Sequence, residues 1–186
     1  YVKAARNVVA AGFDGIEIRM NDGLGYEFTS ALTNRRTDEY GGTLENRLRF
    51  VLDVIHGVRE EVGPDVLLDP RVLVDEIKPG GYGLEEGQEI ARILAATGEL
   101  DFLNTGIGVG TVHEKQGPYP TPLGYGVYAA AAVKKVADIP VVAHGRINDP
   151  VQAEAILAEG KADLIGMARG LIADPEFANK AREGRI

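Results

Sequence analysis

The sequence is short of several residue types, and each shortage excludes a class of protein. It has no cysteine, which excludes a disulfide framework, an iron–sulfur cluster and a cysteine nucleophile within this stretch. No apolar run approaches the ~20 residues that a membrane-spanning helix needs. Lysine and arginine number 20 against 28 acidic residues, and the net charge of −8 argues against nucleic acid or an anionic membrane as a partner. The composition fits a cytoplasmic protein and leaves room for an anionic small molecule in a local basic pocket.

The length of the chain sets a second limit. Its 186 residues are ample for one domain, but a complete eight-stranded β/α barrel usually needs about 250 residues. The first residues, YVKAA, have the character of a helix interior and do not resemble a signal peptide. We therefore expect the sequence to begin inside a larger protein.

Strand-like and helix-like segments alternate along the chain. Gly12, Gly63 and the pair Asp149-Pro150 mark helix boundaries, and nothing signals a hairpin between two strands. This pattern predicts a parallel sheet with helical crossovers. The predicted strands are 13–19, 66–71, 100–105, 139–143 and 162–166. The predicted helices are 1–11, 45–62, 84–96, 127–137, one from 149 and one after 174, and a long loop is predicted over 20–43.

The loops that follow the predicted strands are rich in Gly, Asn, Arg and Asp, whereas those that follow the helices are short. This asymmetry puts the polar chemistry at the carboxyl ends of the strands, where β/α barrels keep their active sites. A doubly wound open sheet would show much the same pattern. No GxGxxG follows a strand, however, which weakens a dinucleotide-binding interpretation.

The last two predicted strands end in similar motifs, HGRI at 144–147 and GMARG at 166–170. Each places a glycine at the strand end with an arginine shortly after it, Gly145 before Arg146 and Gly166 before Arg169. Glycine lets the backbone approach a ligand closely, and free N–H groups at a following helix can hold phosphate oxygens. The two motifs predict a phosphate cradle, with a short helix over 168–172; a metabolite phosphate would suit it as well as a flavin phosphate.

The chain resembles the old yellow enzyme (NADH:flavin oxidoreductase) family, and within it the subgroup of 2,4-dienoyl-CoA reductase and trimethylamine dehydrogenase. The resemblance rests on AGFDGIEI at 11–18, TNRRTDEYGGTLENR at 33–47, GRINDP at 145–150 and the segment 161–186. It implies an FMN-dependent oxidoreductase that transfers hydride between the flavin and a small organic substrate, by enone-type reduction or by amine oxidation or demethylation, with NAD(P)H as a possible electron donor. It also implies that 1–186 is the C-terminal part of one FMN-binding (β/α)8 TIM barrel domain, holding about the last five β/α units without the N-terminal strands.

The resemblance also assigns cofactor contacts. Arg71 matches the arginine that faces the flavin ring near its N1/O2 edge, where a cation stabilises the anionic reduced ring. Gly145, Arg146, Ala168 and Arg169 match contacts to the flavin phosphate. Gly166 and His144 belong to the same cradle, with His144 expected beside the phosphate or the ring. No metal site is predicted, and an iron–sulfur cluster is expected only outside this segment.

One departure from the family concerns the substrate. The family places a His/His, His/Asn or Tyr/His pair after its matching strand, whereas Arg19 and Asp22 stand at these positions here. Tyr26 lies nearby and could supply a hydroxyl. An Arg/Asp pair suits a substrate with a carboxylate and an ammonium, such as an N-methylated amino acid, because arginine binds carboxylates in bidentate fashion. Alternatively, Arg19 and Asp22 simply pair with each other.

Other polar residues are interpreted as structural. The loop 34–42 is expected to be tied by internal ion pairs, together with Asn46 and Arg47, and His56 is expected to be a structural residue on a helix. Asn104, Tyr119 and Tyr125 could line the pocket, but we interpret them as capping and packing residues; His113 is a weak candidate.

Two other functions compete with the flavin enzyme. One is a different phosphate-binding barrel, such as an isomerase or aldolase, which would need a lysine or a carboxylate pair at the strand ends; strand-end lysines are not evident. The other is an inactive fragment or a subunit that needs its missing half, since two open sheet edges invite association with a complementing chain or a second copy.

Overall fold

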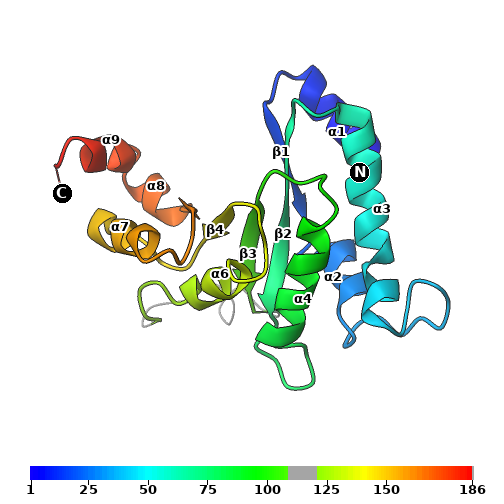
Figure 1. Ribbon diagram of the computed structural model, residues 1–186. Coiled ribbons are helices and arrows are strands. Elements are labelled where there is room, and N and C mark those ends of the chain that lie inside the picture. Colours follow the sequence, from blue (N-terminus) through cyan, green and yellow to red (C-terminus); the bar gives the residue numbers. More distant parts are fainter. Residues whose placement is uncertain (109–120, 186) are drawn as a thin grey trace.

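The computed structural model describes residues 1–108 and 121–185, and its centre is one five-stranded sheet (Figure 1). All neighbouring strands are parallel and follow the chain in the order β1-β2-β3-β4-β5. This confirms the predicted parallel sheet with helical crossovers. The strands are β1 (Gly15–Arg19), β2 (Leu67–Asp75), β3 (Leu103–Ile107), β4 (Val141–Ala143) and β5 (Leu164–Ile165).

Helices connect the strands, and local signals account for several of their ends. Thr43 caps the longest helix by accepting a hydrogen bond from the Asn46 N–H, and Gly63, at φ 78°, ends it. Asp149 caps another and Pro150 is its first residue. The helices are α1 (Val2–Ala10), α2 (Gly23–Thr29), α3 (Leu44–Val62), α4 (Leu84–Ala95), α6 (Val127–Val133), α7 (Pro150–Ala158), α8 (Arg169–Ala173) and α9 (Phe177–Arg182).

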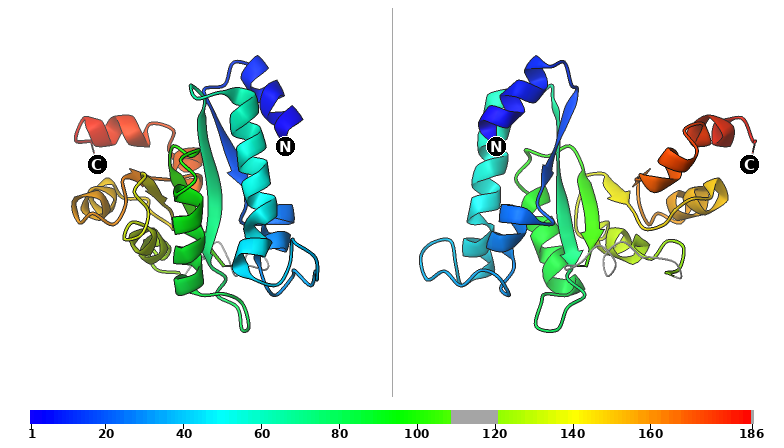
Figure 2. Two further views of the ribbon diagram at one scale, coloured as in Figure 1. Left: turned by 45° about the vertical axis from the view of Figure 1, so that its right-hand side comes forward. Right: turned by 180° about the vertical axis from the view of Figure 1, so that it is seen from behind.

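The two faces of the sheet differ in chemistry. Helices α3 and α4 lie on one side of it (Figure 2), and the strand residues on that side, such as Leu68, Val74 and Leu103, are fully buried. The opposite face carries charged and polar side chains at alternate positions of β1, β2 and β3. On that face Leu67 and Leu164 remain about half exposed in the part of the chain described here. The apolar helix side therefore supplies the core and the other face supplies the site.

The predicted loop over 20–43 is wrong in one respect, because it contains helix α2. The helix sequence, GLGYEFT, has two glycines and little local helix propensity. Tertiary contacts stabilise it instead. Ser30, directly after the helix, donates a 2.6 Å hydrogen bond to the fully buried Glu76, and Tyr26 donates a 3.3 Å bond to the same carboxylate.

Strand β2 continues to Asp75, beyond the predicted end at Arg71, because it is paired with β1 along its first half and with β3 along its second. The loop 34–42 is tied internally, as predicted. Asn34 donates to the carbonyls of Phe28 and Tyr40 at 2.6 and 2.7 Å. Arg36 pairs with Asp38 at 2.9 Å.

Gly87 provides a test of how closely α4 packs on β2. A Cβ at this position would lie 1.8 Å from the carbonyl oxygen of Val74. Gly87→Ala should therefore lower the free energy of unfolding by about 1–3 kcal/mol, although the same change in an exposed helix raises it by up to about 1 kcal/mol. The urea midpoint of the purified protein measures the effect.

Gly57→Ala in α3 is the matched control, because its Cβ would meet only the Val2 side chain, at 3.2 Å. A Gly87→Ala variant as stable as Gly57→Ala would contradict the packing described here.

Candidate functional site

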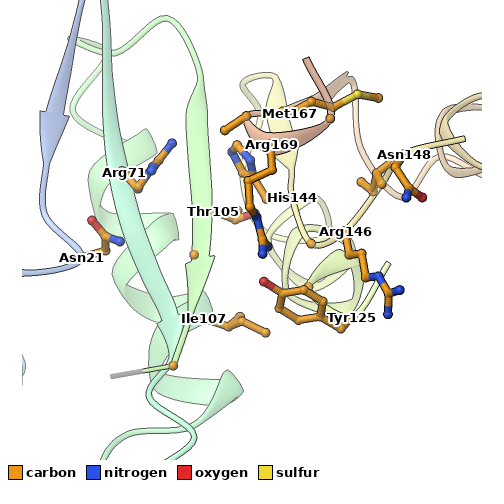
Figure 3. Close-up of a pocket in the computed structure, with 18 of the residues that line it drawn as sticks. Asn21, Arg71, Thr105, Ile107, Tyr125, His144, Arg146, Asn148, Met167 and Arg169 are labelled. Atoms are coloured by element: carbon orange, nitrogen blue, oxygen red, sulfur yellow. The ribbon is translucent and has the colours of Figure 1, made fainter. Parts of the chain in front are cut away.

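A cavity of about 910 Å³ opens at the carboxyl ends of the strands. Residues from the ends of β1, β2 and β3 form one side of it, and the segments that follow β4 and β5 form the other (Figure 3). All the predicted site residues except Tyr26 line this cavity: Arg19, Asp22, Arg71, His144, Gly145, Arg146, Gly166, Ala168 and Arg169. The fold thus gathers around one cavity residues that are up to 150 positions apart in the sequence.

The two glycine motifs lie next to each other in the cavity wall. Gly145 has φ +122°, and a Cβ there would lie 2.5 Å from the backbone nitrogen of Gly126, so the position requires glycine. Arg146 follows in the left-handed region, at φ 53°, and donates to the Thr121 carbonyl. Arg169 begins α8, one residue later than the predicted short helix. In Figure 3 the side chains of Arg146 and Arg169 both lie on the side of the cavity formed by these segments.

Arg71 lies on the opposite side of the cavity, on β2 (Figure 3). Its Nη2 is 3.3 Å from Glu17 Oε2, and its side chain is 35% exposed. Its Nε is buried and has no hydrogen-bond partner among the described residues. A buried donor without a partner costs about 1–3 kcal/mol, so this position favours a ligand that brings an acceptor. The N1/O2 edge of a flavin is such an acceptor, and the residues present fit an FMN on this count.

His144 lies between the two sides. Its Nε2 contacts Asn104 Oδ1, and its ring lies on Gly166, where a Cβ would be 1.9 Å from Cε1. Burial lowers the pKa of His144 to about 4, and the positive charge of Arg71 contributes to the shift. The imidazole is therefore neutral at pH 7 and does not serve as a cation for phosphate.

Arg19 and Asp22 form an ion pair with each other at the cavity rim. Their side chains are 67% and 39% exposed. Of the two alternatives for these residues, the structure shows the mutual pair. Both residues nevertheless line the cavity, and so does Asn21, whose buried Oδ1 has no hydrogen-bond partner among the described residues.

Tyr26 does not reach the cavity. It lies on α2, and its hydroxyl donates to Glu76 at 3.3 Å. Burial is the main reason that the pKa of Tyr26 is raised. The prediction of a catalytic hydroxyl there assumed a loop, and the helix turns this side chain towards the core instead.

Of the remaining candidates in the described residues, one lines the cavity and the others do not. His56 lies on helix α3, as predicted, and its Nδ1 is 2.7 Å from Glu99 Oε1 on the exposed surface. Tyr125 lines the cavity, which goes beyond the packing role predicted for it. Asn104 does not line the cavity; its side-chain amide donates to Glu17. His113 and Tyr119 lie outside the described residues.

Sequence reasoning missed two carboxylates on the polar face of the sheet, Glu17 and Asp69. They are register partners on β1 and β2, each two positions before an arginine. Asp69 is buried, and its Oδ2 has no hydrogen-bond partner among the residues described. Burial raises the pKa of Asp69 to about 7, and the charge of Glu17 adds to the shift. The spacing Glu17-Ile18-Arg19 and Asp69-Pro70-Arg71, charged at alternate positions of a strand, was the available signal.

Within residues 1–108 and 121–185, no group of three or more His, Cys, Asp or Glu side chains could hold a metal ion. None of the helices described in that range has both the length and the apolar character needed to cross a membrane.

Comparison with known proteins identifies relatives over the whole chain. A family model described as the NADH:flavin oxidoreductase / NADH oxidase family matches residues 1–186. The chain is 45% identical to a metal reductase of Desulforamulus reducens, over 99% of the chain and 28% of the relative. It is 38% identical to an N,N-dimethylglycine/sarcosine dehydrogenase of Chromohalobacter salexigens, over 97% of the chain and 27% of the relative. The chain thus spans less than a third of the length of these relatives.

Solved structures agree with this result. A 2-naphthoyl-CoA reductase in complex with 2-naphthoyl-CoA superposes with a TM-score of 0.89 at 35% identity, covering 99% of this chain and 28% of that one. Together with the parallel sheet, this likeness confirms the predicted fold, an α/β arrangement of the β/α-barrel type.

Asp69 gives the site a testable pH dependence. Between its ordinary value of 3.8 and the folded pKa of about 7, the folded protein keeps a proton that the unfolded chain has released, so stability falls as the pH rises. Asp69→Asn removes this loss. The free energy of unfolding of Asp69→Asn, taken relative to that of wild type, should be about 2 kcal/mol more favourable to the folded state at pH 8 than at pH 5, measured by urea unfolding. The exposed Asp65→Asn is the control, and equal pH profiles for Asp69→Asn and wild type would refute the assignment.

Proposed function

Because the chain belongs to the NADH:flavin oxidoreductase / NADH oxidase family, we propose that its protein is an FMN-dependent oxidoreductase. In this proposal the flavin exchanges hydride with a small organic substrate, and NAD(P)H is the electron donor where the substrate is reduced. One observation carries the proposal: the unpaired Nε of Arg71 and the two glycine motifs lie on opposite sides of one cavity. An anionic ring edge and a phosphate, held apart in one molecule, match that arrangement.

The chain's own residues have distinct parts in this proposal. Arg71 would hold the flavin edge and offset negative charge there, while Gly145, Arg146, Gly166, Ala168 and Arg169 would hold the phosphate. His144, neutral at pH 7, would lie beside the ring as a hydrogen-bonding group. Bound FMN would supply the two-electron chemistry that no side chain can provide. The protein residues would bind the flavin, orient it and offset its negative charge.

We infer that the substrate carries a carboxylate, an amine or both. The rim of the cavity offers Arg19 and Asp22, which have opposite charges and remain partly exposed. A carboxylate could replace Asp22 beside Arg19 in bidentate fashion, which would release Asp22 to face an ammonium group. The dehydrogenase relative named for N,N-dimethylglycine and sarcosine acts on compounds of this kind. Amine oxidation or demethylation is therefore favoured here over reduction of an enone, which a charged aspartate cannot polarise.

The proposal also covers the competing barrel enzymes, the extent of the domain and the location of the protein. An aldolase or isomerase that uses a lysine is disfavoured, because no lysine lines the cavity among the described residues. We propose that this chain acts as the C-terminal part of one barrel domain, completed by further sequence or by a complementing chain. The cysteine-free composition supports a cytoplasmic location.

The flavin content of the purified full-length protein tests the central proposal. We expect a yellow protein that releases FMN on denaturation, in a ratio near one flavin per chain. Arg71→Ala should bind FMN about tenfold or more weakly, because a hydrogen bond to a charged group contributes about 1.5–3 kcal/mol. Titration of the apoprotein, followed by flavin fluorescence, measures this loss.

The control is Arg92→Ala, which removes a surface arginine paired with Glu89 at 2.6 Å. It should bind FMN as wild type does. A colourless full-length protein that takes up no FMN would overturn the proposed function.

Arg19 tests the substrate inference. Arg19→Ala should raise KM for N-methylated amino acids about tenfold or more and leave KM for a tertiary amine without a carboxylate unchanged, because only the amino acids lose the partner of their carboxylate. Steady-state kinetics with both substrates measures the split, and Arg6→Ala, which removes an exposed arginine paired with Glu61, is the matched control. Unchanged KM for every amine with a carboxylate would exclude this role.

A further inference from the structure

Four polar side chains form one connected chain across the polar face of the sheet. Arg71 Nη2 lies 3.3 Å from Glu17 Oε2. The same oxygen of Glu17 accepts a hydrogen bond from Asn104 Nδ2, and Asn104 Oδ1 contacts His144 Nε2. The connection runs from β2 to β1, to β3 and to the segment after β4. Its two ends, Arg71 and His144, both line the cavity (Figure 3).

The chemistry of these groups fixes which of them donates the hydrogen bond between Asn104 and Glu17. An ionised carboxylate can only accept, so Asn104 must direct its NH2 group towards Glu17. Asn104 then presents its carbonyl oxygen to His144, which favours the proton on Nε2. A backbone hydrogen bond with Gly166, which raises the pKa of His144, competes for the single proton of the neutral ring. Through a single amide, Glu17 therefore biases the imidazole towards the form with its proton on Nε2.

Because Asn104 is buried, reversing the orientation of its amide would be energetically costly. Asn104 is 7% exposed and already uses its amide group on both sides. His144 lies on Gly166, where even a methyl group would overlap the ring. A reversed amide would put two donors, or two acceptors, face to face in a buried position. The connection is thus a rigid element of the wall.

Glu17 is also the carboxylate that contacts Arg71. Its register partner Asp69 lies nearby, but no hydrogen bond from the described residues reaches Asp69 Oδ2. Because burial raises the pKa of Asp69 to about 7, this group carries only part of a negative charge at neutral pH. The charge of Glu17 therefore offsets part of the charge that Arg71 presents to the cavity.

We propose that Glu17 is a positioning residue with two effects: it orders Asn104 and His144 into one tautomer, and it moderates the attraction of Arg71 for an anionic ligand. The second effect rests on the proposed function, because the anion is then the reduced flavin. The first effect depends on the protein alone.

The first effect is tested by 15N NMR of the full-length protein labelled at histidine, with His144→Gln to assign the signal. In the wild type, His144 should be neutral from pH 6 to pH 8, with its proton on Nε2. In Glu17→Gln, which keeps the size but can present an NH2 group to Asn104, the two nitrogens should shift towards each other as both tautomers become populated.

The second effect is tested by the midpoint potential of bound FMN. Glu17→Gln should make the potential more positive, because Arg71 then stabilises the anionic reduced ring with less compensation. Glu17→Asp, which keeps the charge, should restore most of the wild-type potential. A residue that only supported the fold would not respond to charge in this way.

Glu99→Gln is the matched control, because Glu99 also contacts an imidazole, His56 Nδ1 at 2.7 Å, but on an exposed surface. It should change the His56 signals and leave His144 and the flavin potential unchanged. Identical His144 signals in wild type and Glu17→Gln, or a wild-type proton on Nδ1, would overturn the ordering role. An unchanged potential with FMN bound would overturn the moderating role, whereas a protein without FMN would instead count against the proposed function.

Discussion

Arg19, Arg71 and Asn104 lie level with one another because β1, β2 and β3 run parallel in one register. In a strand, alternate side chains point to the same face, so Glu17 and Asp69 lie one layer below this row. A slip of one residue in either pairing would turn these side chains towards α3 and α4 and bury unpaired charge in the apolar core. The cavity wall, its charge balance and the position of His144 all depend on this alignment.

The alignment also explains how an acidic chain can offer a basic pocket. The net charge is −8, yet Arg19, Arg71, Arg146 and Arg169 all line the same cavity. Arg19 and Arg71 are partly offset by a carboxylate of their own, Asp22 and Glu17. The pocket therefore attracts an anion at defined points rather than through a broad positive field, which suits a small ligand better than a polyanion.

Much of the fold followed from short-range patterns. The helix caps at Asp149 and Gly63, the glycines at strand ends and the absence of hairpin signals predicted a parallel sheet with its polar loops on one edge. The two glycine motifs, whose glycines Gly145 and Gly166 are 21 positions apart, could be predicted to meet because consecutive parallel strands end at the same edge. Helix α2 could not be predicted, because its stability comes from Glu76, 46 positions from Ser30.

The sequence by itself determined the strand–helix alternation, the parallel sheet and which residues stand at the strand ends, since each depends on signals within a few residues. Only the tertiary structure decided what those residues touch. It paired Arg19 with Asp22, turned Tyr26 away from the cavity and joined Asn104 to Glu17 across 87 positions. The physical reason is that side-chain direction is a local property of strand and helix, whereas a hydrogen-bond partner depends on the register between strands that are far apart in the chain.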